Sequence, residues 1–204
     1  MSVEGYANLL AMYGKADAHD VSDGLKAYIR YHDQMHALAV HYGFKFEDTV
    51  AAFCALSPNN DYLGNLRSLV SMLDADDPTT AVVSTYGHCR DRAALYLSGT
   101  PFLDHAKGPK IRAFYQNIID PTAWPPVTVD GHIVATYRGK DLAMKEATIN
   151  GTEYKIVAEA IRELAVGHIG HLHIAQHGAA AEREVTDREG LKRGGAHGRG
   201  FNRP

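Results

Sequence analysis

Cysteine and long apolar runs are scarce in this chain, and each scarcity excludes a class of protein. The 204 residues hold two cysteines, Cys54 and Cys89. Two cysteines cannot build a disulfide framework or a four-thiolate metal site, and such sparing use is typical of a reducing compartment. No window approaches 18 uninterrupted apolar residues, so we expect no membrane span. The first residues carry no positively charged segment followed by an apolar one, so we expect no signal peptide and a cytoplasmic protein.

An excess of positive charge is also missing. The formal net charge is −3 at pH 7, and the isoelectric point is near 6.4. This balance excludes a uniformly basic surface, so any contact with nucleic acid must come from a local basic patch. The hydrophobic share of 45% and the charged share of 22% are ordinary for a folded protein and exclude a wholly disordered chain.

Strand signals are few, whereas apolar residues recur at helical spacing through most of the chain. The only good extended stretch is residues 126–129, which is too short to form a sheet. The fold class that we predict is therefore all-α. Helices are expected over residues 2–13, 20–42, 46–56, 63–73, 78–86, 90–97, 109–119, 132–144 and 153–164, with 169–184 as a further candidate.

The C-terminal end of the chain has its own composition. Residues 190–204 hold five glycines and four basic residues without an apolar period, which is typical of a disordered tail. Such a tail is either solvated without a partner or an arm that binds along the phosphate groups of a nucleic acid. Upstream of it, His173 and His177 would share a helix face, together with His168 and His171 nearby. No acidic or cysteine partner accompanies these histidines, so we predict no metal site.

Three short motifs between residues 53 and 138 carry the functional information. Residues 56–61 read Leu-Ser-Pro-Asn-Asn-Asp, and Asn65 follows. Residues 108–110 read Gly-Pro-Lys and open a helix, with Pro at a position where its missing N–H group does no harm. Residues 127–132 read Val-Thr-Val-Asp-Gly-His after a proline-rich loop.

In this order and spacing, the motifs resemble the helix-hairpin-helix DNA glycosylases, the superfamily of endonuclease III. That family has a Leu-Ser turn that faces DNA, a Gly-x-Lys after the hairpin and a Val-Asp-x-His about twenty residues later. There is a weaker likeness to phage-encoded relatives. The resemblance implies two helical domains with a cleft between them. Residues 46–137 would form the domain with the hairpin, and residues 1–45 plus 138–189 the second domain.

The resemblance also implies the roles of two residues. Cleavage of a glycosidic bond builds positive charge on the sugar, which a carboxylate stabilises, and a neutral amine can attack the sugar carbon to form a Schiff base. By resemblance, Lys110 would be the nucleophile and Asp130 the carboxylate. The alternatives are a solvated lysine in a first helical turn and an aspartate that caps a helix. Asp130 can do both, because one oxygen can cap while the other faces the sugar.

The hairpin before Lys110 would bind the DNA backbone through N–H groups at a tight turn and a helix start. We include Lys107, Gly108, Arg112 and His132 among the predicted DNA contacts. Gly108 matches the second glycine of the family hairpin, whereas the first glycine is missing and Asp104 adds an unfavourable charge. The resemblance further implies no iron–sulfur cluster here and allows a monovalent cation at the hairpin.

The amide-rich turn supplies the remaining predicted DNA contacts, Asn59, Asn60, Tyr62 and Asn65. Amides can satisfy the edge of a flipped base or fill the gap that it leaves, although Asn-rich turns and caps are also common without this role. Two further aromatic residues can stack on a base, Tyr115 and Trp124. Core packing is the simpler interpretation of Tyr115.

These observations lead to one leading hypothesis and two alternatives. The leading hypothesis is a base-excision enzyme that cleaves the N-glycosidic bond of a flipped, modified or damaged nucleotide in DNA. The first alternative is a transferase of the same fold that joins an amino acid or amine to pyrophosphorylated hydroxymethyluracil in DNA. In the transferase, Lys110 would bind the leaving pyrophosphate and Asp130 would act on or position the amine. The second alternative is a non-catalytic DNA-binding protein.

Overall fold

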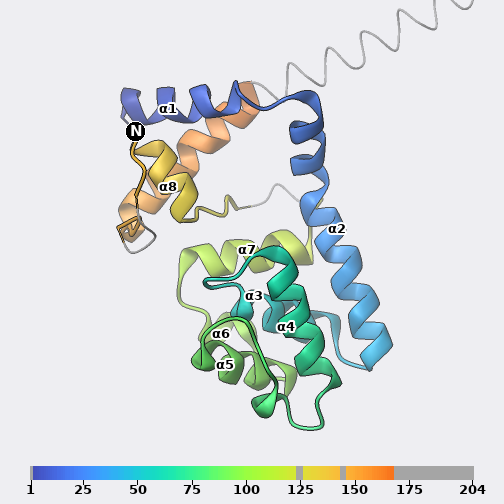
Figure 1. The fold of residues 1–204 in the computed structure, drawn as a ribbon. Helices are drawn as coiled ribbons and strands as arrows, with labels where there is room; N and C mark the ends of the chain where they lie inside the picture. The colour runs from blue at the N-terminus through green and yellow to red at the C-terminus, as the bar shows by residue number, and fades with distance from the viewer. Residues whose placement is uncertain (1, 123–125, 143–145, 168–204) are drawn as a thin grey trace, which may run out of the picture. The chain divides into compact units, whose positions relative to one another are not determined.

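The computed structural model describes residues 2–122, 126–142 and 146–167, and these residues confirm the all-α prediction. No strand occurs among them. The helices, shown in Figure 1, are α1 (Val3–Tyr13), α2 (Ala18–Tyr42), α3 (Phe46–Leu56), α4 (Tyr62–Asp74), α5 (Gly87–Leu97), α6 (Phe102–His105), α7 (Pro109–Ile119) and α8 (Gly131–Tyr137). A 3-10 turn, η1 (Pro78–Thr80), lies between α4 and α5, and residues 151–167 are helical.

Local capping signals explain several helix ends. Asp17 and Asp20 form a reciprocal capping box at the start of α2, in which each side chain accepts a hydrogen bond from the other residue's backbone N–H group. Gly43 ends the same helix in the left-handed conformation, with φ of 74°, which glycine adopts without strain. Asp61 caps α4 by accepting a hydrogen bond from the backbone N–H group of Gly64 at 2.6 Å.

Two expected helices are wrong in extent. The expected helix over residues 78–86 is only the short turn η1, because Ser84 is held outside a helix by hydrogen bonds to Ser68. The helix expected over 132–144 ends at Tyr137, followed by Gly139 with φ of 62°. The short helix α6 was not expected. The candidate helix over 169–184 and the tail 190–204 lie outside the described residues.

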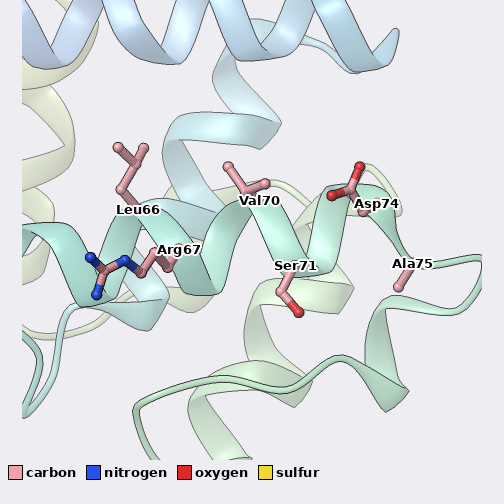
Figure 2. A pocket seen from close by; sticks show the side chains of 6 residues that line it. All are labelled: Leu66, Arg67, Val70, Ser71, Asp74 and Ala75. Carbon is pink, nitrogen blue, oxygen red and sulfur yellow. The ribbon is translucent and has the colours of Figure 1, made fainter.

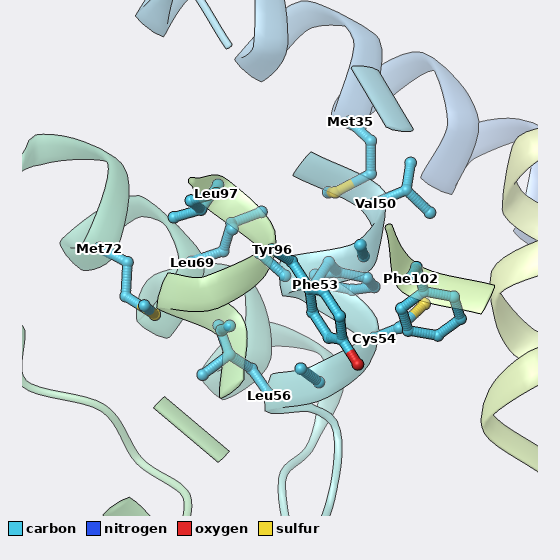
Figure 3. Packing of buried hydrophobic residues seen from close by; sticks show 14 of the residues in the cluster. Met35, Val50, Phe53, Cys54, Leu56, Leu69, Met72, Tyr96, Leu97 and Phe102 are labelled. Carbon is cyan, nitrogen blue, oxygen red and sulfur yellow. The ribbon is translucent and has the colours of Figure 1, made fainter. Parts of the chain in front are cut away.

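The larger hydrophobic core forms around α3. Eight of the eleven residues of α3 are buried, and α2, α4, α5 and α7 all contact this helix. Figure 3 shows side chains from these elements converging, among them Met35, Phe53, Leu69 and Tyr96. Both cysteines are buried and free, and burial raises the pKa of the Cys54 thiol well above its ordinary value. Cys54 is therefore a packing residue and not a nucleophile.

A second, smaller core joins α1 and α8 to the helical residues after 150. Val134 and Tyr137 of α8 pack with Val157 and Ala160. The ring of Tyr137 lies where a side chain on Gly5 would stand, so α1 and α8 approach closely at a glycine. The predicted domain bounds place α8 in residues 46–137, and its buried residues Val134 and Tyr137 belong to this second core.

The chain divides into two compact units, residues 1–161 and residues 162–204. The first unit contains helices α1 to α8 and both cores. The two-domain boundaries expected from the sequence and the cleft between the domains stay predictions. None of the described helices is both long enough and apolar enough to cross a membrane.

Candidate functional site

The hairpin between α6 and α7 leaves the first turn of α7 open to solvent. Gly108 is the N-cap of α7, and no side chain caps the helix. Pro109 occupies the first helical position, and Lys107, Gly108 and Lys110 are all exposed. The uncapped amides of a first helical turn, together with the helix dipole, favour a negatively charged group. The start of α7 therefore has the character that the sequence predicted for a phosphate contact.

Arg112 braces the hairpin from within α7. Its Nη1 atom donates hydrogen bonds to the backbone carbonyls of Leu103 and Ala106, at 3.3 and 3.2 Å. A monovalent cation at the hairpin would need carbonyl oxygens as ligands, and these two already accept from a guanidinium of the chain itself. A carbonyl oxygen has two lone pairs, so these bonds do not exclude a ligand role, and a monovalent cation at the hairpin stays a prediction.

Lys110 is exposed in the first turn of α7. Among the residues that the structure describes, Lys110 makes no ion pair. It stands seven residues before Asn117, which places both on one face of the helix and about 10 Å apart along its axis. Asn117 is 3% exposed, and its Nδ2 atom donates to Thr128 Oγ1 at 3.1 Å. The face of α7 that carries Lys110 is thus bonded, two turns on, to the segment that ends at Asp130.

The extended segment 127–129, which leads into Asp130, is held from two sides. The hydroxyl of Tyr28 donates to Thr128 Oγ1 at 3.1 Å, beside the bond from Asn117. The hydroxyl of Tyr154 accepts from the backbone N–H group of Val129 at 3.1 Å and donates to the carbonyl of Val127 at 2.8 Å. These bonds come from three helical segments, so they fix the position of the residue that follows.

Asp130 follows this segment and caps α8, as the sequence analysis anticipated. Its Oδ1 atom accepts a hydrogen bond from the backbone N–H group of Ile133 at 2.9 Å, and the residue is half-buried. No described residue donates to its second oxygen, Oδ2. Asp130 therefore offers one carboxylate oxygen of fixed orientation. His132, the second residue of α8, is exposed.

The amide-rich turn has a mostly structural set of contacts. Asn60 donates to the carbonyl of Leu56 at 3.3 Å and accepts from the hydroxyl of Ser84 at 2.9 Å. Asn65 is 3% exposed, and its Nδ2 atom donates to the carbonyl of Phe53 at 3.1 Å, so its amide faces the core. Asn59 is exposed with φ of 53°, the left-handed conformation that asparagine tolerates. Of these amides, Asn59 is the one available at the surface.

Tyr62 belongs to a half-buried aromatic group with Tyr28, Tyr31 and Phe114. The rings of Tyr31 and Tyr62 stack at 4.8 Å, and Phe114 meets Tyr28 at 6.2 Å. The Tyr62 hydroxyl donates to the side chain of Gln34. Burial raises the pKa of Tyr31 and of Tyr62, so both phenols are neutral at ordinary pH. Tyr62 was predicted from the sequence, whereas Tyr28, Tyr31 and Phe114 were not. The spacing of Tyr28 and Tyr31, one helical turn apart on α2, is the signal that could have found them.

The other residues singled out from the sequence lie either in the larger core or outside the described residues. Tyr115 stacks on Phe102 at 4.3 Å and packs against the larger core, and burial raises the pKa of Tyr115 to about 12. Trp124 and the histidines from His168 to His177 lie outside the described residues. A shallow groove along α4, shown in Figure 2, contains none of the predicted residues. Asp74 lines this groove, and its hydrogen bond with Tyr42 raises the pKa of Tyr42.

Comparisons with known proteins place the chain in a family without giving it an activity. No curated protein and no solved structure matches the sequence. A family of unknown function, DUF7178, matches residues 2–172, which is most of the chain. The protein is therefore a member of the DUF7178 family.

Proposed function

We propose that the protein is a DNA base-excision enzyme that cleaves the N-glycosidic bond of a flipped, modified or damaged nucleotide. The observation that supports this most is Asp130, whose carboxylate caps α8 with one oxygen and leaves the other without a donor among the described residues. A helix cap alone needs no bracing of the preceding segment by Tyr28, Asn117 and Tyr154. A carboxylate that must stand beside a sugar does need it, because its effect depends on fixed orientation.

In the proposed reaction, Asp130 and Lys110 act on the same sugar. As the bond between C1′ and the base nitrogen breaks, its electrons leave with the base, which takes up a proton. The free oxygen of Asp130 stabilises the positive charge that develops on the sugar. The amine of Lys110 attacks C1′, and a proton passes from its nitrogen to the ring oxygen O4′ as the C1′–O4′ bond breaks, which leaves a Schiff base between Lys110 and C1′. Water later hydrolyses the Schiff base and frees the lysine.

The proposed partner is DNA, and the proposed location is the cytoplasm. The surface around Lys110 and Asp130 supports a DNA contact. The open start of α7 would take a backbone phosphate, with Lys107 and Arg112 nearby to offset its charge. Asn59 stands at the surface of its turn and would contact a base, whereas Tyr62 and its aromatic group offer partly exposed rings for stacking. These contacts need only a local basic patch, so an acidic isoelectric point for the whole chain is compatible with them.

The test is a base-release assay over duplex and single-stranded DNA that carries a panel of altered bases. Asp130→Asn is the sharpest variant, because asparagine caps helices as well as aspartate and the fold should survive. We expect this variant and Lys110→Gln to lower the rate of base release by about 10²–10⁴-fold. Asp76→Asn and Lys15→Gln, which change exposed charges elsewhere, are the matched controls. No base release from any substrate by the wild type would contradict the proposal.

The transferase is a second candidate, and the uncapped start of α7 beside Lys107 and Lys110 favours it, because a pyrophosphate group suits such a place. Mass spectrometry of nucleosides would separate the two reactions, from DNA that carries pyrophosphorylated hydroxymethyluracil and is incubated with the protein and an amine, which displaces the pyrophosphate. An amine-bearing thymine points to the transferase, and a free base points to excision. If the wild type forms neither product but binds DNA, the protein is a non-catalytic DNA binder.

A further inference from the structure

A pocket of about 470 Å³ lies between α5 and the α6–α7 hairpin, apart from Lys110 and Asp130. Its floor is apolar, formed by Ala55, Pro58, Phe102 and Ile111. A smaller pocket of about 330 Å³ continues along α5, and the two share Arg92, Tyr96 and His105. The volume falls within the range of small-molecule sites, which combine an apolar floor with a few polar groups.

Tyr96 is the polar group at the base of this pocket. The residue is 1% exposed, and its buried hydroxyl has no hydrogen-bond partner among the described residues. Figure 3 shows the hydroxyl end of the ring directed toward the region of Phe102 and the end of α3, whose residues line the pocket. The rings of Tyr96 and Phe102 meet at 5.1 Å. A buried hydroxyl without a partner is unfavourable, so this one marks a place where a ligand atom can complete the hydrogen bond.

Positive charge gathers at the rim of the same pocket. Arg92 stands one helical turn before Tyr96, is exposed and makes no ion pair within the described part of the chain. Lys107 is exposed on the hairpin, and Gly108 brings the uncapped start of α7 to the pocket wall. The acid that lines the smaller pocket, Asp91, is paired with Arg90 at 2.8 Å. The exposed Asp104 of α6 is the other acid close in sequence, so cations outnumber acids at the larger pocket.

We propose that this pocket binds a small phosphate ester with a ring-shaped body, of the size of a nucleoside monophosphate. Arg92, Lys107 and the start of α7 take the phosphate, since a fork of N–H donors and a helix start both suit its oxygens. The ring lies on the apolar floor, and its polar edge reaches the hydroxyl of Tyr96. Neither proposed catalytic residue lines the pocket. Lys107 and the start of α7 are the groups that the base-excision proposal gives to a DNA backbone phosphate, so the competition experiment below decides which phosphate they take.

The test is direct titration of the full chain, by calorimetry and by NMR, without DNA. The probes are thymidine monophosphate, phenyl phosphate and inorganic phosphate. We expect saturable binding of both esters and weaker binding of inorganic phosphate, which cannot use the floor. Arg92→Gln should weaken ester binding about tenfold, and Tyr96→Phe several-fold, because each removes one hydrogen-bonding group. Arg67→Gln, on the exposed face of α4, is the matched control and should leave binding unchanged.

The outcomes separate the possibilities cleanly. No saturable binding of either ester at millimolar concentration overturns the proposal, and so does an equal loss in Arg92→Gln and Arg67→Gln, which would mean general charge attraction. Competition by a single-stranded oligonucleotide would identify the source of the phosphate as a DNA strand, and lack of competition would identify it as a free nucleotide. The titration does not measure base release. The pocket proposal can therefore fail while base excision stands, and base excision can fail while the pocket proposal stands.

Discussion

Tyr154 should stabilise the segment before Asp130 by more than a typical tyrosine hydroxyl contributes. Tyr154→Phe removes the acceptor for the N–H group of Val129 at 3.1 Å and the donor to the carbonyl of Val127 at 2.8 Å. Val129 is 3% exposed, so its N–H group cannot turn to water. One buried donor left unsatisfied costs about 1–3 kcal/mol, and one partly accessible hydrogen bond contributes about 1 kcal/mol. We therefore expect a loss of about 2–4 kcal/mol in the free energy of unfolding.

The measurement is urea unfolding followed by circular dichroism, with melting temperature as a second readout. In a chain of this size, about 2–4 kcal/mol corresponds to a fall of about 4–16 °C. Tyr28→Phe removes one bond to Thr128 Oγ1, which keeps its bond from Asn117, so about 1 kcal/mol or less is expected. Tyr86→Phe, at a 52% exposed ring, is the control and should change little. If Tyr154→Phe is no less stable than Tyr86→Phe, the segment is not held as we describe.

Three further predictions concern packing and pH. Gly64→Ala should destabilise the first turn of α4 by about 1–3 kcal/mol in urea unfolding, because a Cβ atom would stand 2.4 Å from Asn60 Oδ1. Gly5→Ala should destabilise by about 1–3 kcal/mol, because its Cβ atom would stand 2.4 Å from the ring of Tyr137. Tyr115, whose pKa is raised to about 12 by burial, keeps its proton in the folded state above pH 10 while the unfolded chain releases it. Stability should therefore fall as the pH rises from 10 toward 12, and less steeply in Tyr115→Phe.

Matched controls make these predictions refutable. A Cβ atom at Gly24, inside α2, would meet nothing within 4 Å, so Gly24→Ala should stabilise the helix by up to about 1 kcal/mol. If Gly64→Ala or Gly5→Ala behaves like Gly24→Ala, the close approaches are not present in solution. If an absorbance titration near 295 nm shows that all tyrosines ionise near pH 10, the burial of Tyr115 is contradicted.

Much of the helical framework was predictable from the sequence. The bounds of α3 and α7 match the expected ranges 46–56 and 109–119, because continuous apolar burial and a proline at a helix start are local signals. The expectation failed at 78–86, where hydrogen bonds between Ser84 and Ser68, sixteen residues away, decide the conformation. Local periodicity carries no information about such a bond.

The candidate site likewise has a part that the sequence predicts and a part that it does not. That Asp130 caps a helix could be predicted, because an aspartate at the end of an extended stretch is a local signal. The bonds that brace it could not, because Tyr28 and Tyr154 reach the segment across 100 and 25 residues. The unpartnered hydroxyl of Tyr96 was equally hidden, since its position next to the hairpin depends on the packing of α5 against α3.

A crystal structure of the protein with abasic-site DNA would test the central proposal most directly. The proposal predicts the opened sugar within bonding distance of Lys110 Nζ, with the free oxygen of Asp130 facing the same sugar. A complex in which the DNA lies on another surface, or in which the abasic sugar contacts neither side chain, would contradict it.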